Sequence, residues 1–197
     1  MDQVDGRRAR GDATRRTVAR EAAMVATVSG LDSITVGGLA AATGVSKSGI
    51  LTVFGSRESI QVAAVGEARK IFAAAVMAPA WGEDPGGARL HAILDAWLAY
   101  QRGEVFRGGC FLTATSVEYG HRDGPVADSV RALKREWLTL LAADLATAGH
   151  PEPEDAAFRI DALLAGANTM YQLFGGDAEL ERGVRHARAV VEECPAR

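Results

Sequence analysis

The run LAAATGVSKSGILTVFGSRE, at residues 39–58, constrains the fold of this chain more than any other segment. It places the small residue Ala40 four positions before Gly44, and Gly44 six positions before the aliphatic Ile50. Two short helices that cross at a tight turn need this arrangement, because the crossing requires a small side chain and the turn favours a residue that tolerates positive φ. The run therefore predicts a helix-turn-helix, with a generic αα-hairpin as the alternative.

Apolar periodicity along the rest of the chain predicts an all-α protein. Helices are expected over residues 14–29, 36–43, 46–54, 56–77, 88–102, 111–119, 126–148, 155–174 and 178–192. Thr35, Ser46 and Ser56 stand where their side-chain oxygens can cap the second, third and fourth of these helices. Nothing alternates with period two for long enough to argue for a sheet.

The net charge of -3 excludes a general polycation, so any contact with nucleic acid depends on a local basic surface. The N-terminal segment supplies one, because arginines are concentrated within residues 7–20. We expect residues 1–11 to form a flexible basic arm. Arg15 and Arg16 follow on the first helix and are candidates for contacts with phosphates.

In a helix-turn-helix, the second helix lies in the major groove of DNA and the first helix supports it. Leu39, Val45 and Phe54 are expected to complete a small core around Ile50. The outward positions are then short, polar or cationic, and can approach a groove closely: Ser46, Lys47, Ser48, Gly49 and Thr52. Lys47 can reach a phosphate or a guanine edge, and hydroxyl groups can donate to phosphates or bases. The run thus predicts a double-stranded DNA operator as a partner.

The segment from Thr14 to Leu51, followed by FGSRESIQ at 54–61, resembles the N-terminal domain of the TetR family of transcriptional regulators. The family pattern T-V-x-x-L-A-x-x-x-G-V-S-K-x-x-[IL], then F-x-S-[KR]-E-x-[IL], is matched without a gap. The resemblance implies a three-helix N-terminal DNA-binding domain over residues 12–56. It also implies a larger helical effector-binding and dimerisation domain over residues 57–197.

Two further features follow from the same resemblance. Residues 107–130, RGGCFLTATSVEYGHRDGPVADSV, resemble one subgroup of C-terminal domains in that family. The last two expected helices fit the pair that forms a four-helix bundle with a partner subunit. The resemblance therefore implies a homodimer that uses its two C-terminal helices.

The chain departs from the family pattern at Leu51 and Val53, where relatives often carry aromatic or histidine side chains that contact phosphates. Here both residues are aliphatic. The resemblance then assigns phosphate contacts to other positions: Lys47, Thr52, Thr35, Arg57 at the start of the next helix, and the N-terminal arginines.

A regulator that responds to an effector needs a second site that biases its DNA-binding state. Aromatic and polar residues of the second domain are candidates for lining a pocket for an unknown small-molecule effector: Trp97, Tyr100, Cys110, Thr113, Trp137, Asn168 and Tyr171. The alternative for each is an ordinary core residue. Glu118 and Asn168 could orient a ligand, and each could equally be exposed or cap a turn.

Other chemistries have little support in the sequence. Cys110 follows two glycines at an expected helix start, so a redox role and a small buried hydrophobic residue are both open. Glu118 and His121 match half of a bundle metal motif, but the sequence holds no second copy. No motif of a hydrolase or metalloprotease is present. We expect no catalytic residue, no metal and no cofactor.

The sequence has no apolar run near the roughly 18 residues of a membrane span, and its Arg-rich start is unlike a secretory signal. We therefore expect a cytoplasmic protein with no membrane partner. The most specific prediction is a ligand-responsive homodimeric repressor of a near-palindromic operator. The alternatives are an effector-independent DNA-binding protein and, more remotely, a helical enzyme.

Overall fold

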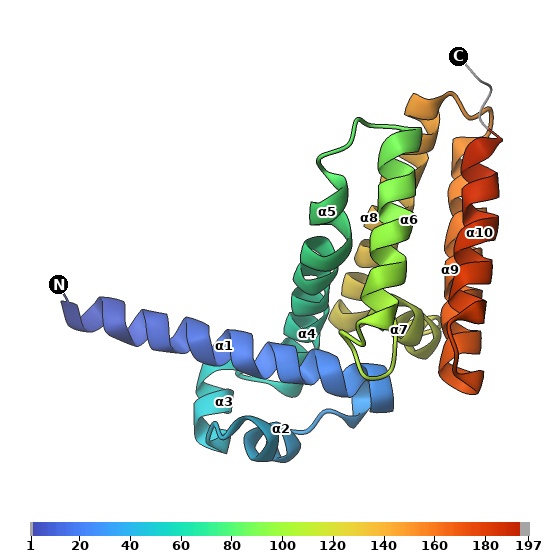
Figure 1. The fold of residues 1–197 in the computed structure, drawn as a ribbon. Helices are drawn as coiled ribbons and strands as arrows, with labels where there is room; N and C mark the ends of the chain where they lie inside the picture. The colour runs from blue at the N-terminus through green and yellow to red at the C-terminus, as the bar shows by residue number, and fades with distance from the viewer. Residues whose placement is uncertain (1, 194–197) are drawn as a thin grey trace.

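The computed structural model describes residues 2–193, and side chains from residue 11 to residue 193. Within that range the structure contains helices and no strand, as predicted (Figure 1). The elements are α1 (Asp2–Ser29), η1 (Leu31–Ser33), α2 (Val36–Thr43), α3 (Lys47–Phe54), α4 (Arg57–Phe72), η2 (Ala73–Met77), α5 (Ala78–Ala80), α6 (Gly87–Arg102), α7 (Phe111–Tyr119), α8 (Pro125–Ala148), α9 (Pro153–Phe174) and α10 (Ala178–Glu192).

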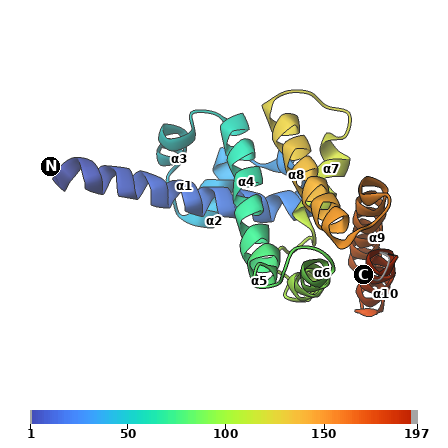
Figure 2. The ribbon, with the colours of Figure 1, turned by 90° about the horizontal axis from the view of Figure 1, so that it is seen from above.

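The helices form two groups that share α4. The long helix α1 extends to one side of the molecule, and α2 and α3 lie beneath it (Figure 1). The helices from α4 to α10 form an upright bundle, in which α9 and α10 stand at the side away from the free end of α1 (Figure 2). Because α1 packs against the start of α4, the two groups are continuous.

The start of α1 differs from the prediction. The helix begins at Asp2, so it runs through the segment that was expected to form a flexible arm. No proline interrupts the first turns, and Asp2 and Asp5 lie at the end of a helix where negative charge is favourable. Met1 and the side chains of residues 2–10 lie outside the described part of the chain.

The predicted helix over 56–77 is divided into two parts. It is α-helical to Phe72 and continues as a π-helix over Ala73–Met77, and the short helix α5 follows beyond the predicted end. Pro79 lies in α5, where it removes a backbone donor and its ring crowds the preceding turn. We attribute the wider π turn to this proline, since such turns accommodate an interrupted hydrogen-bond ladder.

The core follows the apolar stripes of the helices. In the N-terminal group, Leu39, Ile50 and Phe54 are buried as predicted, and the side chain of Ile50 is 0% exposed. Val45 is half-buried and packs against them. In the bundle, α9 and α10 approach closely because Gly183 has no side chain: a Cβ there would lie 2.4 Å from the Cβ of Ala167.

Candidate nucleic-acid interface and ligand cavity

The turn between α2 and α3 has the geometry that its sequence predicts. Gly44 adopts a φ of 72° and donates its N–H to the Ala40 carbonyl oxygen at 3.0 Å, which ends α2. The Ser46 hydroxyl accepts from the Gly49 N–H at 3.1 Å, which begins α3. The two helices meet at 115°, within the range of a helix-turn-helix.

The pair of α2 and α3 has one further property. Within residues 2–193, no single helix is long and apolar enough to cross a membrane, whereas this bent pair passes the same test on length and composition. Its apolar character reflects the absence of charge: Lys47 is the only charged residue between Asp32 and Arg57.

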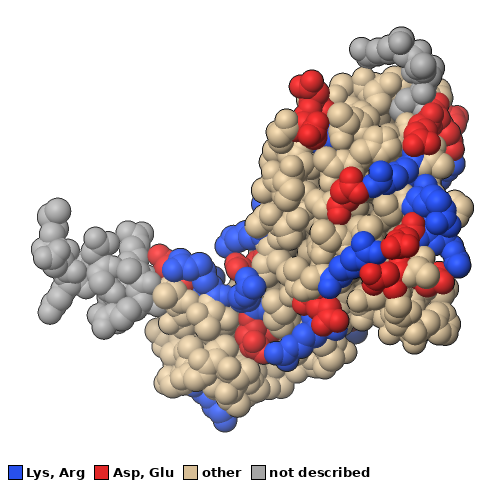
Figure 3. Space-filling model, viewed as in Figure 1, with Lys and Arg blue, Asp and Glu red and all other residues tan. Residues whose placement is uncertain are grey.

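The outward face of α3 is therefore a nearly uncharged surface with one cation. Ser46, Lys47, Ser48 and Thr52 are exposed, and Gly49 is half-buried. The lower end of the molecule, where α2 and α3 lie, is mostly tan in the space-filling view, with one blue group at its tip (Figure 3). A Cβ at Gly37 would lie 3.6 Å from Lys47 Cε, so the lysine extends beside the start of α2.

The hydroxyl groups near this surface are already engaged in local hydrogen bonds. Thr35 accepts from the Gly38 N–H at 3.0 Å and caps α2. Thr52 donates to the Ser48 carbonyl oxygen at 2.8 Å, and the Ser46 and Ser48 hydroxyls lie 3.2 Å apart. Thr52 was expected to donate to DNA. In this arrangement its proton is used within α3, which leaves its oxygen lone pairs as acceptors.

The structure places two of the three predicted arginines in contacts within the protein. Arg15 donates to the Val53 carbonyl oxygen at 2.8 Å, and its guanidinium lies 4.9 Å from the centre of the Phe54 ring. It thus caps the end of α3 and fixes α1 against that helix. Arg57 donates to the carbonyl oxygen of Asp32 and lies 3.7 Å from its carboxylate. Arg16 is exposed and makes no hydrogen bond or ion pair with residues 11–193.

A polar cluster that the sequence did not predict connects the two groups of helices. Glu118 accepts the backbone N–H groups of Leu31 and Asp32 at 2.8 and 2.9 Å. Tyr119 donates to the Asp32 carboxylate at 2.9 Å, and Arg122 pairs with the same carboxylate. We call these five residues the η1–α7 joint. Of the possibilities considered for Glu118, the structure shows the cap of a turn.

The contacts within the η1–α7 joint favour the ionised carboxylate of Asp32 and the protonated phenol of Tyr119. The hydrogen bond from Arg122 is the main cause that lowers the pKa of Asp32, against a smaller opposing effect of burial. Burial first, and then the hydrogen bond to Asp32, raises the pKa of Tyr119 to about 12. At neutral pH the carboxylate is therefore ionised and the phenol is protonated, as the observed donor and acceptor require.

A cavity of about 280 Å³ lies between α4, η2, α6, α7 and α8. Its wall is dominated by five aromatic residues: Phe72, Trp81, Tyr100, Phe111 and Trp137. The first turn of α7 contributes Phe111 and Leu112 to this wall. The cavity is therefore built from the same helix that carries Glu118 and Tyr119 at its other end.

The predicted pocket residues divide into three groups. Tyr100, Cys110 and Trp137 line the main cavity. Trp97 and Thr113 line a neighbouring space of about 20 Å³. Neither space includes Asn168 or Tyr171 in its wall. Asn168 instead accepts the Cys110 N–H at 3.0 Å, which caps the start of α7 from α9.

Most residues of the main cavity were not predicted from the sequence, and three of them, Phe72, Arg69 and Glu136, matter most for its chemistry. Phe72 makes edge-to-face contacts with Tyr100 and Trp137, at ring distances of 5.6 and 5.4 Å. Arg69 and Glu136 form a two-point ion pair in the wall, at 2.6 and 2.5 Å. Phe72 follows Ala68 by four residues, so both lie on one face of α4, and both line the cavity. This spacing is the signal in the sequence that could have identified that face.

A helix-turn-helix joined to a helical bundle that encloses a cavity defines a DNA-binding regulator with a second, ligand-binding domain. Residues 86–187 match the family model described as "Tetracyclin repressor-like, C-terminal domain". The chain belongs to the TetR family of transcriptional regulators. Comparison with the curated proteins gives no match.

Solved structures of TetR regulators share the whole fold. A TetR transcriptional regulator from Chloroflexus aurantiacus J-10-FL is 26% identical, with a TM-score of 0.84 over 94% of this chain and 97% of that chain. One from Cytophaga hutchinsonii is 19% identical, with a TM-score of 0.83 over 95% and 98%. AibR, solved in complex with isovaleryl coenzyme A and operator DNA, is 17% identical, with a TM-score of 0.70 over 92% and 99%.

Proposed function

We propose that this protein is a homodimeric repressor that binds a near-palindromic operator and releases it when a small molecule enters the main cavity. The single observation that carries the proposal is the position of α7. One end of this helix forms the cavity wall and the other end holds η1, directly before the helix-turn-helix. A constitutive DNA-binding protein has no need of that connection.

On the DNA side, Lys47 is the central candidate. It is the only cation on the exposed face of α3, and the neighbouring Ser48 hydroxyl is also exposed. A lysine in a major groove contacts a phosphate or the O6 and N7 acceptors of guanine. We further propose phosphate contacts from Arg16 on α1, and an indirect role for Arg15, which holds α1 against α3.

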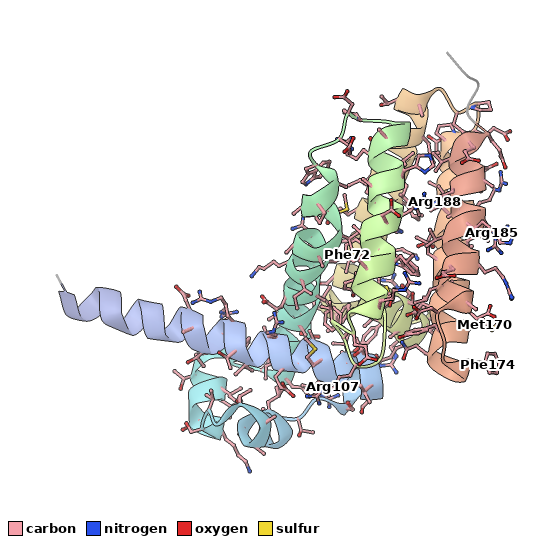
Figure 4. All side chains as sticks on the ribbon, in the orientation of Figure 1. Phe72, Arg107, Met170, Phe174, Arg185 and Arg188 are labelled. Carbon is pink, nitrogen blue, oxygen red and sulfur yellow. The ribbon has the colours of Figure 1, made fainter. Side chains whose placement is uncertain are left out.

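The dimer interface that we propose lies on α9 and α10. Exposed apolar or small residues recur along one face of α9: Phe158, Ala162, Gly166, Met170, Leu173 and Phe174. The Phe174 side chain is 76% exposed, and Met170 and Phe174 point away from the bundle (Figure 4). A stripe with helical spacing that finds no partner within one chain fits a second copy of the same helix pair.

The signal would pass from the cavity to α3 through two contacts, one with η1 and one with the end of α1. The first is the η1–α7 joint. The second is the approach of Gly108 to Thr27, whose hydroxyl accepts the Gly108 N–H at 3.2 Å. A Cβ at Gly108 would lie 1.9 Å from the Thr27 carbonyl oxygen, so the backbones are in direct contact. A ligand that shifts the first turn of α7 therefore also shifts η1.

Selection of genomic DNA fragments by the purified full chain tests this function. We expect strong enrichment of a few sites that contain an inverted repeat. The protein should release these sites when a small molecule binds in the main cavity. Enrichment without any ligand effect would favour the effector-independent alternative. Absence of sequence-specific enrichment would refute the regulatory function.

A further inference from the structure

The chemistry of the cavity wall restricts the class of molecule that can occupy it. Its only charged residues are Arg69 and Glu136, and they pair with each other through two hydrogen bonds at 2.6 and 2.5 Å. The remaining wall is aromatic or aliphatic, apart from Cys110 and the hydroxyl of Tyr100. An anionic ligand would find no free cation there, and a cationic ligand no free carboxylate.

The hydroxyl of Tyr100 stays uncharged. Burial, followed by the nearby Cys110 thiol, raises the pKa of Tyr100. The hydroxyl is therefore a phenol that can exchange one hydrogen bond with a ligand, and not a phenolate that would attract a cation. This group can orient a neutral molecule without adding charge to the cavity.

The size and shape of the space favour a small, flat occupant. About 280 Å³ is slightly below the roughly 300–1,000 Å³ of pockets for drug-sized ligands. Phe72 stands at 80° to the ring of Tyr100 and at 84° to that of Trp137, and it lies at the end of α4 within the bundle (Figure 4). Rings at right angles offer both edges and faces to a third aromatic ring.

We propose that the effector is a neutral, flat and mostly apolar molecule, about the size of two fused aromatic rings, that lies against Phe72, Tyr100 and Trp137. Its role as an effector rests on the proposed function, whereas its binding does not. The Arg69–Glu136 pair stands in the wall with about half of each side chain exposed, 56% and 50%, and each charge is offset by the other rather than left for a ligand.

Three naphthalene derivatives of similar shape test the charge preference. Calorimetry on the full chain without DNA at pH 7 compares neutral 2-naphthol, anionic 2-naphthoate and cationic 2-naphthylmethylammonium. We expect 2-naphthol to bind at least about tenfold more tightly than either ion, a difference of about 1.4 kcal/mol. Tighter binding of either ion, or no detectable binding of any of the three, would overturn the inference.

A charge variant sharpens this test without changing the shape of the cavity. Glu136→Gln frees Arg69, so the affinity for 2-naphthoate should rise by about tenfold while that for 2-naphthol stays nearly constant. Asp95→Asn is the matched control, because Asp95 pairs with Arg188 on the α6–α10 side and lines neither space. An equal gain in both variants, or none in Glu136→Gln, contradicts the assignment.

A second pair of variants locates the site. Ala73 lines the cavity and its neighbour Ala74 does not, although both are exposed on the π-helix. Ala73→Phe should weaken 2-naphthol binding at least about tenfold, and Ala74→Phe should leave it unchanged. The reverse result places the ligand elsewhere. If circular dichroism shows that Ala73→Phe does not fold, the Glu136→Gln comparison decides.

The same ligands separate this inference from the proposed function. Binding of 2-naphthol that leaves the affinity for a selected operator unchanged supports the ligand class and contradicts the coupling. Operator release by 2-naphthoate but not by 2-naphthol supports a ligand-responsive regulator and refutes the neutral class. Operator release by 2-naphthol that Ala73→Phe abolishes supports both.

Discussion

Glu118 on α7 accepts a hydrogen bond from the backbone N–H of Leu31 at 2.8 Å, across 87 residues of sequence. The same carboxylate accepts the next N–H of η1, so it caps the turn that leads into the helix-turn-helix. A carboxylate that holds two backbone donors fixes their direction as well as their distance. The position of α7 is therefore transmitted to η1 through direct bonds.

Glu118→Gln should weaken this connection. The amide keeps one acceptor oxygen but turns an NH₂ group toward a backbone donor, so one hydrogen bond is lost. We expect the free energy of unfolding in urea to fall by about 1–3 kcal/mol, because one backbone N–H of η1 is left without an acceptor. Glu83→Gln, in the loop between α5 and α6, is the control and should change it by less than about 0.5 kcal/mol. Equal effects of both substitutions would contradict the role of the joint.

The Asp32 carboxylate makes a specific prediction for acid unfolding. Its pKa is lower in the folded protein than the ordinary 3.8, mainly because Arg122 donates to it. Its stabilising effect is thus complete above the ordinary pKa and is lost as the pH falls through the lowered folded value. The difference in unfolding free energy between the wild type and Asp32→Asn should stay constant from pH 8 to about pH 5 and shrink below about pH 4.

Tyr119→Phe provides the comparison for that titration. It removes one hydrogen bond to Asp32 but keeps the carboxylate and Arg122. Its unfolding free energy should therefore retain most of the acid dependence, because Arg122 lowers the pKa of Asp32 more than Tyr119 does, whereas Asp32→Asn loses the whole contribution of this carboxylate. If the two variants have the same pH profile, the carboxylate of Asp32 does not contribute as described.

Lys47→Ala should weaken operator binding and its dependence on salt. If Lys47 contacts a phosphate in each subunit, the slope of log K against log salt should fall by about one unit per subunit. If it contacts guanine, affinity for the selected site should fall by about 1–3 kcal/mol with less change in the slope. Lys70→Ala, which removes an exposed lysine paired with Glu67 on α4, is the control. Equal binding by Lys47→Ala and the wild type would remove Lys47 from the interface.

Gly44→Val should disrupt the turn between α2 and α3. A β-branched residue at a φ of 72° costs about 1–3 kcal/mol of backbone strain. We expect lower thermal stability and loss of operator binding. Gly66→Ala is the matched control, because Gly66 lies inside α4 with nothing within 4 Å of an added Cβ. That variant should gain about 0.5–1 kcal/mol. Wild-type DNA binding by Gly44→Val would contradict the assigned turn.

The local rules of helix formation explain why much of the fold could be predicted from the sequence. Thr35, Ser46 and Ser56 all cap the helices that they were expected to cap, because a cap depends only on residues within one turn. Gly44 and Ile50 occupy their predicted places for the same reason. The π turn at Ala73–Met77 was not predicted because it results from Pro79, which lies two residues beyond the end of the expected helix.

The candidate site was predictable only in part, because its residues meet through tertiary packing. Arg15 has the charge of a phosphate contact, and only the fold brings it to the Val53 carbonyl oxygen. Asn168 has the chemistry of a ligand contact, yet it caps α7 across 58 residues. The apolar pattern of α4 predicts that an aromatic residue such as Phe72 is buried. It does not show whether that residue packs in a filled core or lines a cavity.

Hydroxyl-radical footprinting of the full chain on a selected DNA fragment shows whether two copies of α3 contact one operator. We expect two protected half-sites in inverted orientation, with centres one helical turn apart or a multiple of it, about 34–36 Å per turn. A single protected half-site, or uniform protection without sequence preference, would contradict this arrangement.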